Sequence, residues 1–242
     1  MTTQRMHVLL VGGAGYVGSQ MGALLADQGA QVTTLDNLCG GHRDAVLHGR
    51  FIEGDLADLA LLSQVLAQGQ FDAVMHFASF IQVGESVRHP ARYYRNNVVN
   101  TLNLLQCMVE AGVKRFIFSS TAAIFGEPAY TPIDEGHPRQ PLNPYGRSKQ
   151  QTDGGADAGG GQWSMGNGTG YSVQEVIDTA RAVTGRDIPL LEGERRPGDP
   201  ARLVADSSRA REHLGWAPRH GALETIIAHA WQWELRMAGL GL

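Results

Sequence analysis

The sequence has few of the features that mark secreted or metal-binding proteins. Only two cysteines occur among 242 residues, and neither Cys39 nor Cys107 belongs to a CxxC or metal-type spacing. The nine histidines form no HExxH or HxxxH pattern. We therefore expect a reduced, cytoplasmic chain with no disulfide framework and no metal site.

Blocks of one charge and long hydrophobic runs are missing as well. Lysine and arginine number 20 against 24 acidic residues, which gives a formal net charge of -4 without a basic run. This balance gives no electrostatic reason to expect nucleic acid or an anionic membrane as a partner. The apolar run near the N-terminus is too short for a signal peptide or a membrane span. A small-molecule substrate is the expected partner.

Short apolar segments alternate with helical patterns over the first 150 residues. "MHVLLVGG", "AQVTTLD", "RFIEGDL", "FDAVMHFAS" and "KRFIFSST" are each typical of a buried parallel strand. Helices are expected at Tyr16 to Gln28 and over "HPARYYRNNVVNTLNLLQCMVEAG", which Gly112 closes. This alternation predicts an α/β fold with a Rossmann-type, doubly wound parallel sheet, so residues 1–150 are interpreted as a dinucleotide-binding domain.

A glycine-rich junction over residues 151–165 separates this domain from residues 166–242, which are interpreted as the remnant of a C-terminal substrate-binding part. In that remnant, "SVQE" is a capping box that opens a helix reaching about Val183. "DIPLLE" predicts a short strand. Two more helices are expected, over "DSSRAREHLG" and over residues 222–237.

The segment "VGGAGYVG" follows the first strand and opens the first helix. It matches GxGxxG through Gly13, Gly15 and Gly18, and GxxGxxG when Gly12 replaces Gly13. Glycines permit a tight turn and a close approach of the backbone to a pyrophosphate, while the helix N-terminus attracts anions. Asp36 ends the second strand, where its carboxylate would accept from a ribose and repel a 2′-phosphate. The pattern favours NAD over NADP; a tight turn without ligand is the alternative.

Tyr145 and Lys149 are four residues apart, so a helix would place them on one face. A tyrosine with its ordinary pKa near 10 is a poor base at pH 7. We expect a neighbouring ammonium and a positive nicotinamide ring to lower that pKa. Hydroxyls of Ser119, Ser120 and Thr121 follow the fifth strand, at the sheet edge where ligands of such folds bind. These groups together predict an oxidoreductase-type active site.

Taken together, these residues resemble the extended short-chain dehydrogenase/reductase superfamily, and within it the UDP-glucose 4-epimerases. The resemblance covers most of both ends of the chain. It is carried by "GGAGYVGS", "LDNL", "GDL", "HFAS", "VGESV", "YYRNNVVNTLNLL", "FIFSSTAAIFG", "PYGRSK", "GNGTGYSVQEVI", "RRPGDPA" and "LGWAP".

This resemblance implies an isomerase that carries bound NAD and interconverts UDP-glucose and UDP-galactose. Tyr145 would take the 4-hydroxyl proton while the C4 hydride moves to the cofactor, and the hydride would return to the other face of a 4-keto sugar. Lys149 would hold the nicotinamide ribose, and Thr121 would orient the substrate. Arg196 and Asp199 match residues that grip the UDP moiety.

The resemblance also implies a set of cofactor contacts. Asp55 would lie near the adenine, and Gln82 stands where some epimerases carry a lysine. The cofactor-binding set is Gly12, Gly15, Tyr16, Val17, Gly18, Asp36, Asn37, Asp55, Leu56, Phe77, Ala78, Ser79, Gln82, Asn96, Ser119, Tyr145 and Lys149.

Related nucleotide-sugar dehydratases and decarboxylases resemble one another in carrying an acid just after the position of Thr121. Ala122 and Ala123 stand there in this chain, which favours epimerisation over those reactions. A third interpretation is an inactive remnant that binds NAD without turnover. Members of the family form homodimers through two long helices, so the resemblance also implies a homodimer.

The chain departs from the family after Lys149. In relatives, a long segment between "YGRSK" and "GNG" supplies another strand and much of the sugar pocket; here "TDGGADAGGG" takes its place. Codons for this stretch, read one base later, permit the amphipathic sequence Arg-Met-Val-Glu-Gln-Met-Leu-Ala-Ala. The junction is therefore interpreted as a frameshift or deletion scar, or alternatively as a glycine-rich linker. We expect residues 153–162 to be flexible, and apolar faces to be left uncovered.

Overall fold

The computed structural model describes residues 5–154, 161–194 and 199–239. The chain divides into two compact units with interleaved sequence. The N-terminal unit contains Met1–Thr121 and Asn143–Ala158, and the C-terminal unit contains Ala122–Leu142 and Gly159–Leu242. The predicted boundary at residue 150 stays a prediction, and residues 122–142 group with the C-terminal unit.

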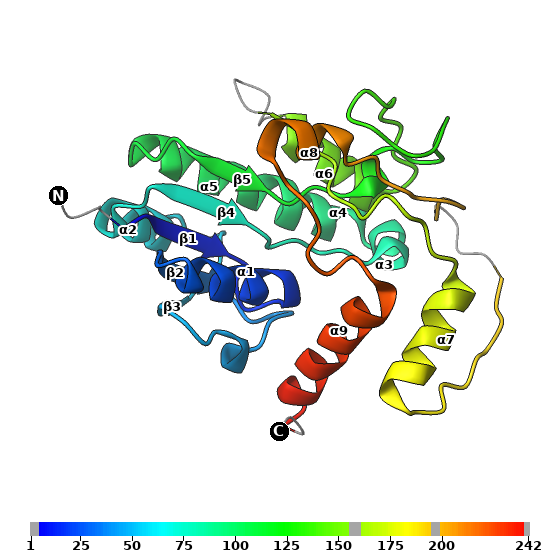
Figure 1. Ribbon diagram of the computed structural model, residues 1–242. Helices are drawn as coiled ribbons and strands as arrows, with labels where there is room; N and C mark the ends of the chain where they lie inside the picture. The colour runs from blue at the N-terminus through cyan, green and yellow to red at the C-terminus, as the bar shows by residue number, and fades with distance from the viewer. Residues whose placement is uncertain (1–4, 155–160, 195–198, 240–242) are drawn as a thin grey trace. The chain divides into compact units, whose positions relative to one another are not determined.

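The N-terminal unit is built on a five-stranded, all-parallel sheet (Figure 1), as the alternating pattern predicts. The strand order is β3-β2-β1-β4-β5, so the first strand is central and the chain winds outward in both directions. All five predicted strands form. They are β1 (His7–Val11), β2 (Gln31–Asp36), β3 (Arg50–Glu53), β4 (Ala73–His76) and β5 (Phe116–Phe118).

Helices connect these strands. The predicted first helix is confirmed, whereas the single long helix expected before Gly112 is divided into three segments by a π-helical stretch. The helical elements of this unit are α1 (Tyr16–Asp27), η1 (Arg43–Ala45), α2 (Leu59–Gly69), α3 (Val83–Arg88), α4 (Pro90–Tyr93), η2 (Tyr94–Val99), α5 (Asn100–Glu110) and α6 (Pro144–Gly154). A π-helical stretch widens a helix locally and is frequent at functional sites; η2 carries Asn97, whose contacts are described below.

Both faces of the sheet are covered near its centre. On one face Leu9 and Leu35 pack with Leu62 of α2 and Leu104 of α5. On the other face Leu10 packs with residues of α1 such as Met21. Burying each such side chain stabilises the fold by about 1.5–3 kcal/mol. Leu9 and Leu10, at the centre of the sheet, are fully buried on opposite faces.

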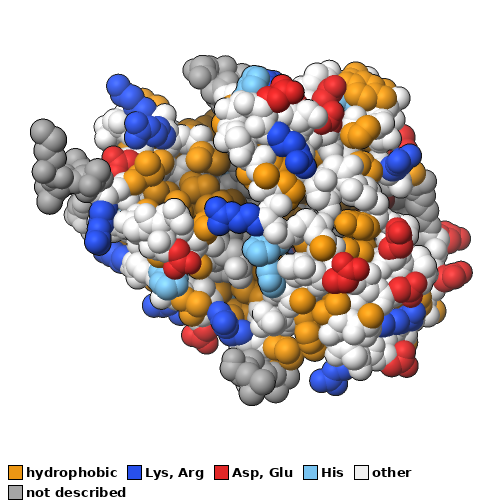
Figure 2. Space-filling view, viewed as in Figure 1, with side chains coloured by type: hydrophobic (Ala, Val, Ile, Leu, Met, Phe, Trp, Pro, Cys, Tyr) orange, Lys and Arg blue, Asp and Glu red, His pale blue; other side chains and the backbone are white. Residues whose placement is uncertain are grey.

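The sheet is less complete at β5. Within the described residues no strand pairs with the outer side of β5. Ile117, the middle residue of β5, is 53% exposed. Figure 2 shows hydrophobic side chains at the surface over β4 and β5. A free edge and an uncovered apolar face are therefore present where the family resemblance implies that a segment is missing.

Helix α6, which carries Tyr145 and Lys149, continues through the buried Asp153 to Gly154. The expectation of a flexible stretch from residue 153 is thus wrong for these two residues. Residues 155–160 of that stretch lie outside the described residues.

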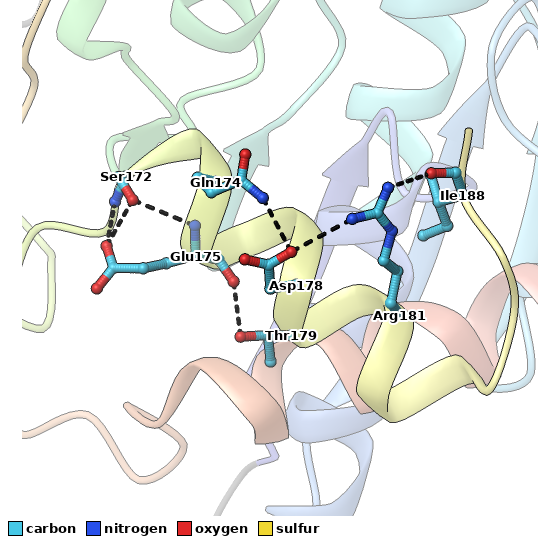
Figure 3. Close-up of polar contacts among 7 residues, drawn as sticks. All are labelled: Ser172, Gln174, Glu175, Asp178, Thr179, Arg181 and Ile188. Atoms are coloured by element: carbon cyan, nitrogen blue, oxygen red, sulfur yellow. Dashed lines mark hydrogen bonds and ion pairs between the residues drawn. The ribbon is translucent and has the colours of Figure 1, made fainter. Parts of the chain in front are cut away.

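The C-terminal unit consists mainly of α7 (Val173–Thr184), α8 (Ser208–Leu214) and α9 (Leu223–Met237), with a short helix η3 (Ala122–Ile124). The three predicted helices are confirmed. The predicted capping box is present, because the Ser172 hydroxyl accepts from the Glu175 N–H and the Glu175 carboxylate accepts from the Ser172 N–H (Figure 3).

The strand predicted at residues 187–192 does not form. The Ile188 carbonyl accepts from the Arg181 guanidinium at 2.6 Å, and Asp178 accepts from the same side chain (Figure 3). A strand needs a partner strand to satisfy its backbone, and here a side chain of α7 takes that place for Ile188. No described helix is long and apolar enough to cross a membrane.

Candidate active site

The glycine-rich loop after β1 requires glycine at two positions for packing. Gly12 has φ +77°, and a Cβ there would lie 2.4 Å from the Ala78 nitrogen. A Cβ on Gly18 would lie 2.4 Å from the Gly12 carbonyl oxygen. Either substitution would push α1 or the loop after β4 away from β1.

The first turn of α1 is open to a ligand. Gly15 is the N-cap, makes no side-chain capping bond and has space above it, since an added Cβ would meet only the Gly12 carbonyl oxygen at 3.7 Å. Val17 is 57% exposed, and the first turn carries no acidic residue. Uncapped N–H groups and the positive end of a helix dipole suit an anion. These features fit the pyrophosphate of a dinucleotide.

Asp36 is held in place at the end of β2 beside this loop. Its carboxylate accepts from the Ala14 N–H at 2.9 Å and from the Leu38 N–H at 2.8 Å. A carboxylate offers about four lone-pair sites, so it can still accept from two ribose hydroxyls. Its negative charge opposes a 2′-phosphate, which fits NAD rather than NADP.

The adjoining loop after β3 is ordered by a second carboxylate. Asp55 accepts from the Asn37 side-chain amide at 2.6 Å and from the Ala57 N–H at 2.8 Å. Leu56, predicted among the cofactor contacts, has its side chain in the core beneath α2. Only its backbone and the neighbouring Asp55 could therefore face a ligand.

The segment after β4 joins the cofactor loop to the reactive helix. The Phe77 N–H donates to the Val11 carbonyl at 2.7 Å, and Ala78 lies against Gly12. The Ser79 hydroxyl accepts from the Lys149 side chain at 2.9 Å. The ends of β1 and β4 and helix α6 are thus brought together, as the sequence predicts.

Lys149 is 3% exposed, and its amine is held by hydrogen bonds and an aromatic ring. Its Nζ donates to the Ser79 hydroxyl and, at 2.6 Å, to the Ser119 carbonyl, and lies 4.3 Å from the centre of the Phe118 ring. Burial lowers the pKa of Lys149 to about 8, and the charge of Asp153 counteracts part of this effect. The amine is therefore poised to exchange a proton near neutral pH.

Tyr145 is buried one turn before Lys149 on α6. Burial raises the pKa of Tyr145, and a hydrogen bond with the Thr121 side chain lowers it in part. The expected lowering by Lys149 is wrong for this structure, because the Lys149 amine is directed to Ser79 and Ser119 instead. The predicted triad of Tyr145, Lys149 and Thr121 is nevertheless assembled in one place.

Three further predicted positions lie at the border of the site. The Asn96 amide donates to the Asn97 side chain at 2.9 Å. Gln82 caps α3, and its backbone N–H donates to the Tyr93 hydroxyl at 3.1 Å. The Ser120 hydroxyl is buried without a hydrogen-bond partner among the described residues, whereas Ser119 contacts Lys149 through its carbonyl.

Sequence reasoning missed the residues that hold these side chains in position. Asn97 is buried in η2, accepts from the Phe80 N–H at 2.9 Å, and donates to the Phe80 carbonyl and, at 3.1 Å, to the Ser148 hydroxyl. Tyr93 packs edge-on against Tyr145, with 6.5 Å between ring centres. A buried asparagine amid helical apolar positions is the signal that would have identified this network.

One of the two predicted UDP-binding residues lies among the described residues. Arg196 lies outside the described residues. Asp199 is half-buried in the C-terminal unit. Ala122 and Ala123 begin η3 directly after Thr121, so no acid stands at those positions. Within the described residues no three histidine, cysteine or acidic side chains cluster as a metal site would require.

Comparison with known proteins identifies one family. The model of the NAD dependent epimerase/dehydratase family matches residues 8–161. UDP-glucose 4-epimerase of Halalkalibacterium halodurans is 35% identical and aligns over 95% of this chain and 96% of its own length. The enzyme of the same name from Lactobacillus helveticus is 34% identical, with 95% of this chain and 97% of the relative aligned.

Solved structures give the same result. UDP-glucose 4-epimerase from Brucella ovis in complex with NAD has a TM-score of 0.84 and 30% identity, with 92% of this chain and 96% of that chain covered. The enzyme from Bifidobacterium longum in complex with NAD+ and UDP has a TM-score of 0.87 and 26% identity, with 98% and 100% covered.

The alignments also show that the chain is short. The alignment with the Halalkalibacterium protein extends over 319 positions, 77 more than the 242 residues of this chain. The family match ends at residue 161, within the predicted junction over residues 151–165. Relatives that align along nearly their whole length thus carry a substantial segment that this chain lacks.

Proposed function

Because the chain belongs to the NAD dependent epimerase/dehydratase family, we propose that it is built to interconvert UDP-glucose and UDP-galactose by inverting C4 of the sugar. NAD is the cofactor of this family. The single observation that supports the reaction best is the joint placement of Tyr145, Lys149 and Thr121 beside the glycine-rich loop.

The loop and the strand ends would hold the cofactor. The open first turn of α1 suits its pyrophosphate, and Asp36 suits a ribose. When bound, NAD supplies a reversible hydride acceptor for C4 of the sugar. The roles of Gln82, Asn96 and Asp55 in cofactor binding remain part of this proposal.

Tyr145 would move the proton of the sugar 4-hydroxyl. Its hydroxyl is held by the Thr121 side chain, so both groups can contact one substrate oxygen. The phenolate form of Tyr145 would accept this proton as the C4 hydride leaves the sugar, and the resulting phenol would return it as C4 is reduced. Lys149, fixed by Ser79 and Ser119, would position the ribose of the cofactor.

The remaining parts of the proposal concern the UDP moiety and assembly. Arg196 and Asp199 would bind the diphosphate and the ribose of UDP. A homodimer built on α5 and the YxxxK helix α6 would follow the family pattern; α5 exposes Leu102 and Val109.

A second candidate is an NAD-binding chain without turnover. The free edge of β5, the exposed Ile117 and the 77 additional alignment positions favour it. The glycine-rich loop, Asp36 and α6 do not separate the two candidates, because both candidates need them. A dehydratase or decarboxylase is disfavoured by Ala122 and Ala123, which cannot donate a proton.

Turnover of UDP-galactose by the purified 242-residue chain, with no cofactor added, distinguishes these candidates. Formation of UDP-glucose would support the epimerase, with NAD carried through purification. A folded chain that releases NAD on denaturation but forms no UDP-glucose would support the NAD-binding remnant. A folded chain that neither holds nor binds NAD would contradict both.

A further inference from the structure

A hollow of about 650 Å³ lies at the edge of the sheet opposite the cofactor loop. It is lined by His7, Gln31 and Arg50, which begin β1, β2 and β3, and by the last turns of α2. The glycine-rich loop and Asp36, in contrast, follow the carboxyl ends of their strands. The hollow is therefore separate from the candidate active site.

The floor of the hollow is polar where the sheet face is otherwise apolar. Leu9 and Leu35 point to the core beneath α2, and two residues earlier along the same strands His7 and Thr33 point to that same side. Thr33 is 3% exposed, and its hydroxyl lies 3.0 Å from the Nε2 of His7. The hydroxyl and the imidazole therefore pair with each other, the His7 ring packs on Phe71, and together they give the hollow a polar floor.

Two arginines line the hollow and give it positive charge. Arg50 stands opposite Thr33 in the sheet register, and Arg5 precedes β1. Within the described part of the chain neither guanidinium has an ion-pair or hydrogen-bond partner. The one carboxylate in the lining, Asp72, already accepts from the His7 N–H at 2.7 Å. Two guanidinium groups without such partners match the charge of a phosphate.

The lining also offers acceptors. Helix α2 ends at Gly69, so its last carbonyls and the negative end of its dipole lie at the hollow. Gln70, which follows, has φ +46°, an uncommon backbone conformation for a residue with a side chain. Asp72 retains acceptor capacity on its second oxygen. These acceptors suit hydroxyl groups and disfavour a second phosphate.

We propose that this hollow binds a phosphorylated sugar, with the phosphate at Arg5 and Arg50 and the hydroxyls at Asp72 and the end of α2. The volume lies within the range of small-molecule sites, about 300–1,000 Å³. The proposal does not depend on the proposed epimerase activity, since none of these residues belongs to the active site.

Isothermal titration calorimetry of the full chain with glucose 1-phosphate tests the proposal. NAD and UDP are kept in the cell so that the active site is occupied. The wild-type chain is expected to bind glucose 1-phosphate, and Arg50→Gln and Arg5→Gln should each weaken binding about 10-fold or more. The matched control Arg236→Gln, an exposed arginine on α9, should leave the affinity unchanged.

Inorganic phosphate and glucose serve as separate probes. Each should bind at least about 10-fold more weakly than glucose 1-phosphate, because each engages only some of the lining groups. Equal affinities of wild type and the folded Arg50→Gln variant, no binding by the wild type at millimolar ligand, or phosphate binding as tightly as glucose 1-phosphate would each overturn the proposal. Thermal unfolding of each variant establishes that it is folded.

Discussion

The two units of the chain differ in how completely they bury their apolar side chains. In the N-terminal unit Leu9 and Leu10 are fully buried on the two faces of one strand. In the C-terminal unit α7 has no buried residue, and Leu191 is 98% exposed. Hydrophobic burial is the dominant favourable term in folding. The cofactor-binding unit is therefore expected to carry most of the stability, and the C-terminal unit little.

The largest expected effect concerns chemistry in the N-terminal unit. Tyr145→Phe should lower any epimerase turnover by about 10²–10⁴-fold, because it removes the hydroxyl that moves the proton. NAD binding should persist, since the glycine-rich loop and Asp36 are untouched. Coupled detection of UDP-glucose measures the turnover, and the amount of NAD released on denaturation measures the binding. Unchanged turnover in this variant would exclude Tyr145 as the proton-transfer group.

The comparison of cores can be tested by two matched substitutions. Leu9→Ala should lower the free energy of unfolding by about 2–5 kcal/mol, because it opens a cavity at the centre of the sheet. Leu191→Ala should change it by less than about 0.5 kcal/mol, because the side chain is almost fully exposed. Urea denaturation monitored by circular dichroism measures both. Similar effects of the two substitutions would contradict the contrast between the units.

Lys149 links stability to pH within the better-packed unit. Its pKa is about 8 in the folded chain against 10.5 ordinarily, so between these values the unfolded chain binds more protons. Stability contributed by this group is thus lowest below pH 8 and rises towards pH 10.5, by roughly 3 kcal/mol at most. The difference in unfolding free energy between wild type and Lys149→Met should shift in favour of wild type from pH 7.5 to 9.5. Parallel pH curves would show that the amine is not desolvated.

The uncovered side of β5 predicts self-association of the N-terminal unit. Ile117→Asp should reduce the fraction of oligomers and raise solubility, because a charge on a sheet edge opposes edge-to-edge pairing. Sedimentation velocity of the two chains at equal concentration measures the change. Leu191→Asp is the matched control in the C-terminal unit. An equal loss of oligomers in both variants would assign the association to general surface hydrophobicity.

The smallest effect concerns the cap of α7. Ser172→Ala removes the acceptor of the Glu175 N–H and should destabilise α7 by about 1 kcal/mol. Hydrogen exchange of the first α7 amides measures this locally, and Ser172→Asp, which restores an acceptor, is the control. Faster exchange with alanine but not with aspartate is the expected result.

Local patterns predicted the elements that depend on local chemistry. The strands, the glycine-rich loop, the Ser172 capping box and the Tyr145–Lys149 spacing are each encoded within a few residues. The strand predicted at residues 187–192 failed because a strand depends on a partner elsewhere in the chain. Its apolar composition alone could not supply that partner.

Long-range contacts account for what the sequence did not reveal at the active site. Asn97 forms hydrogen bonds with Phe80 and Ser148, which are far from it in the sequence. No short sequence pattern predicts these contacts. The direction in which the pKa of Tyr145 shifts likewise depends on burial and on which acceptors engage Lys149. The spacing of Tyr145 and Lys149 identified them as a pair, but only the packed structure shows which acceptors the Lys149 amine contacts.

The interleaving of the two units has a consequence for synthesis on the ribosome. The five strands are complete at residue 118, but α6, which supplies Tyr145 and Lys149, is made only after a 21-residue excursion, Ala122–Leu142, into the other unit. Until then Ser79 and the Ser119 carbonyl have no lysine to bind. The active site of the nascent chain therefore stays incomplete until α6 has been synthesised. In a chain cleaved within residues 122–142, α6 would be on a separate fragment and would have to bind the sheet non-covalently.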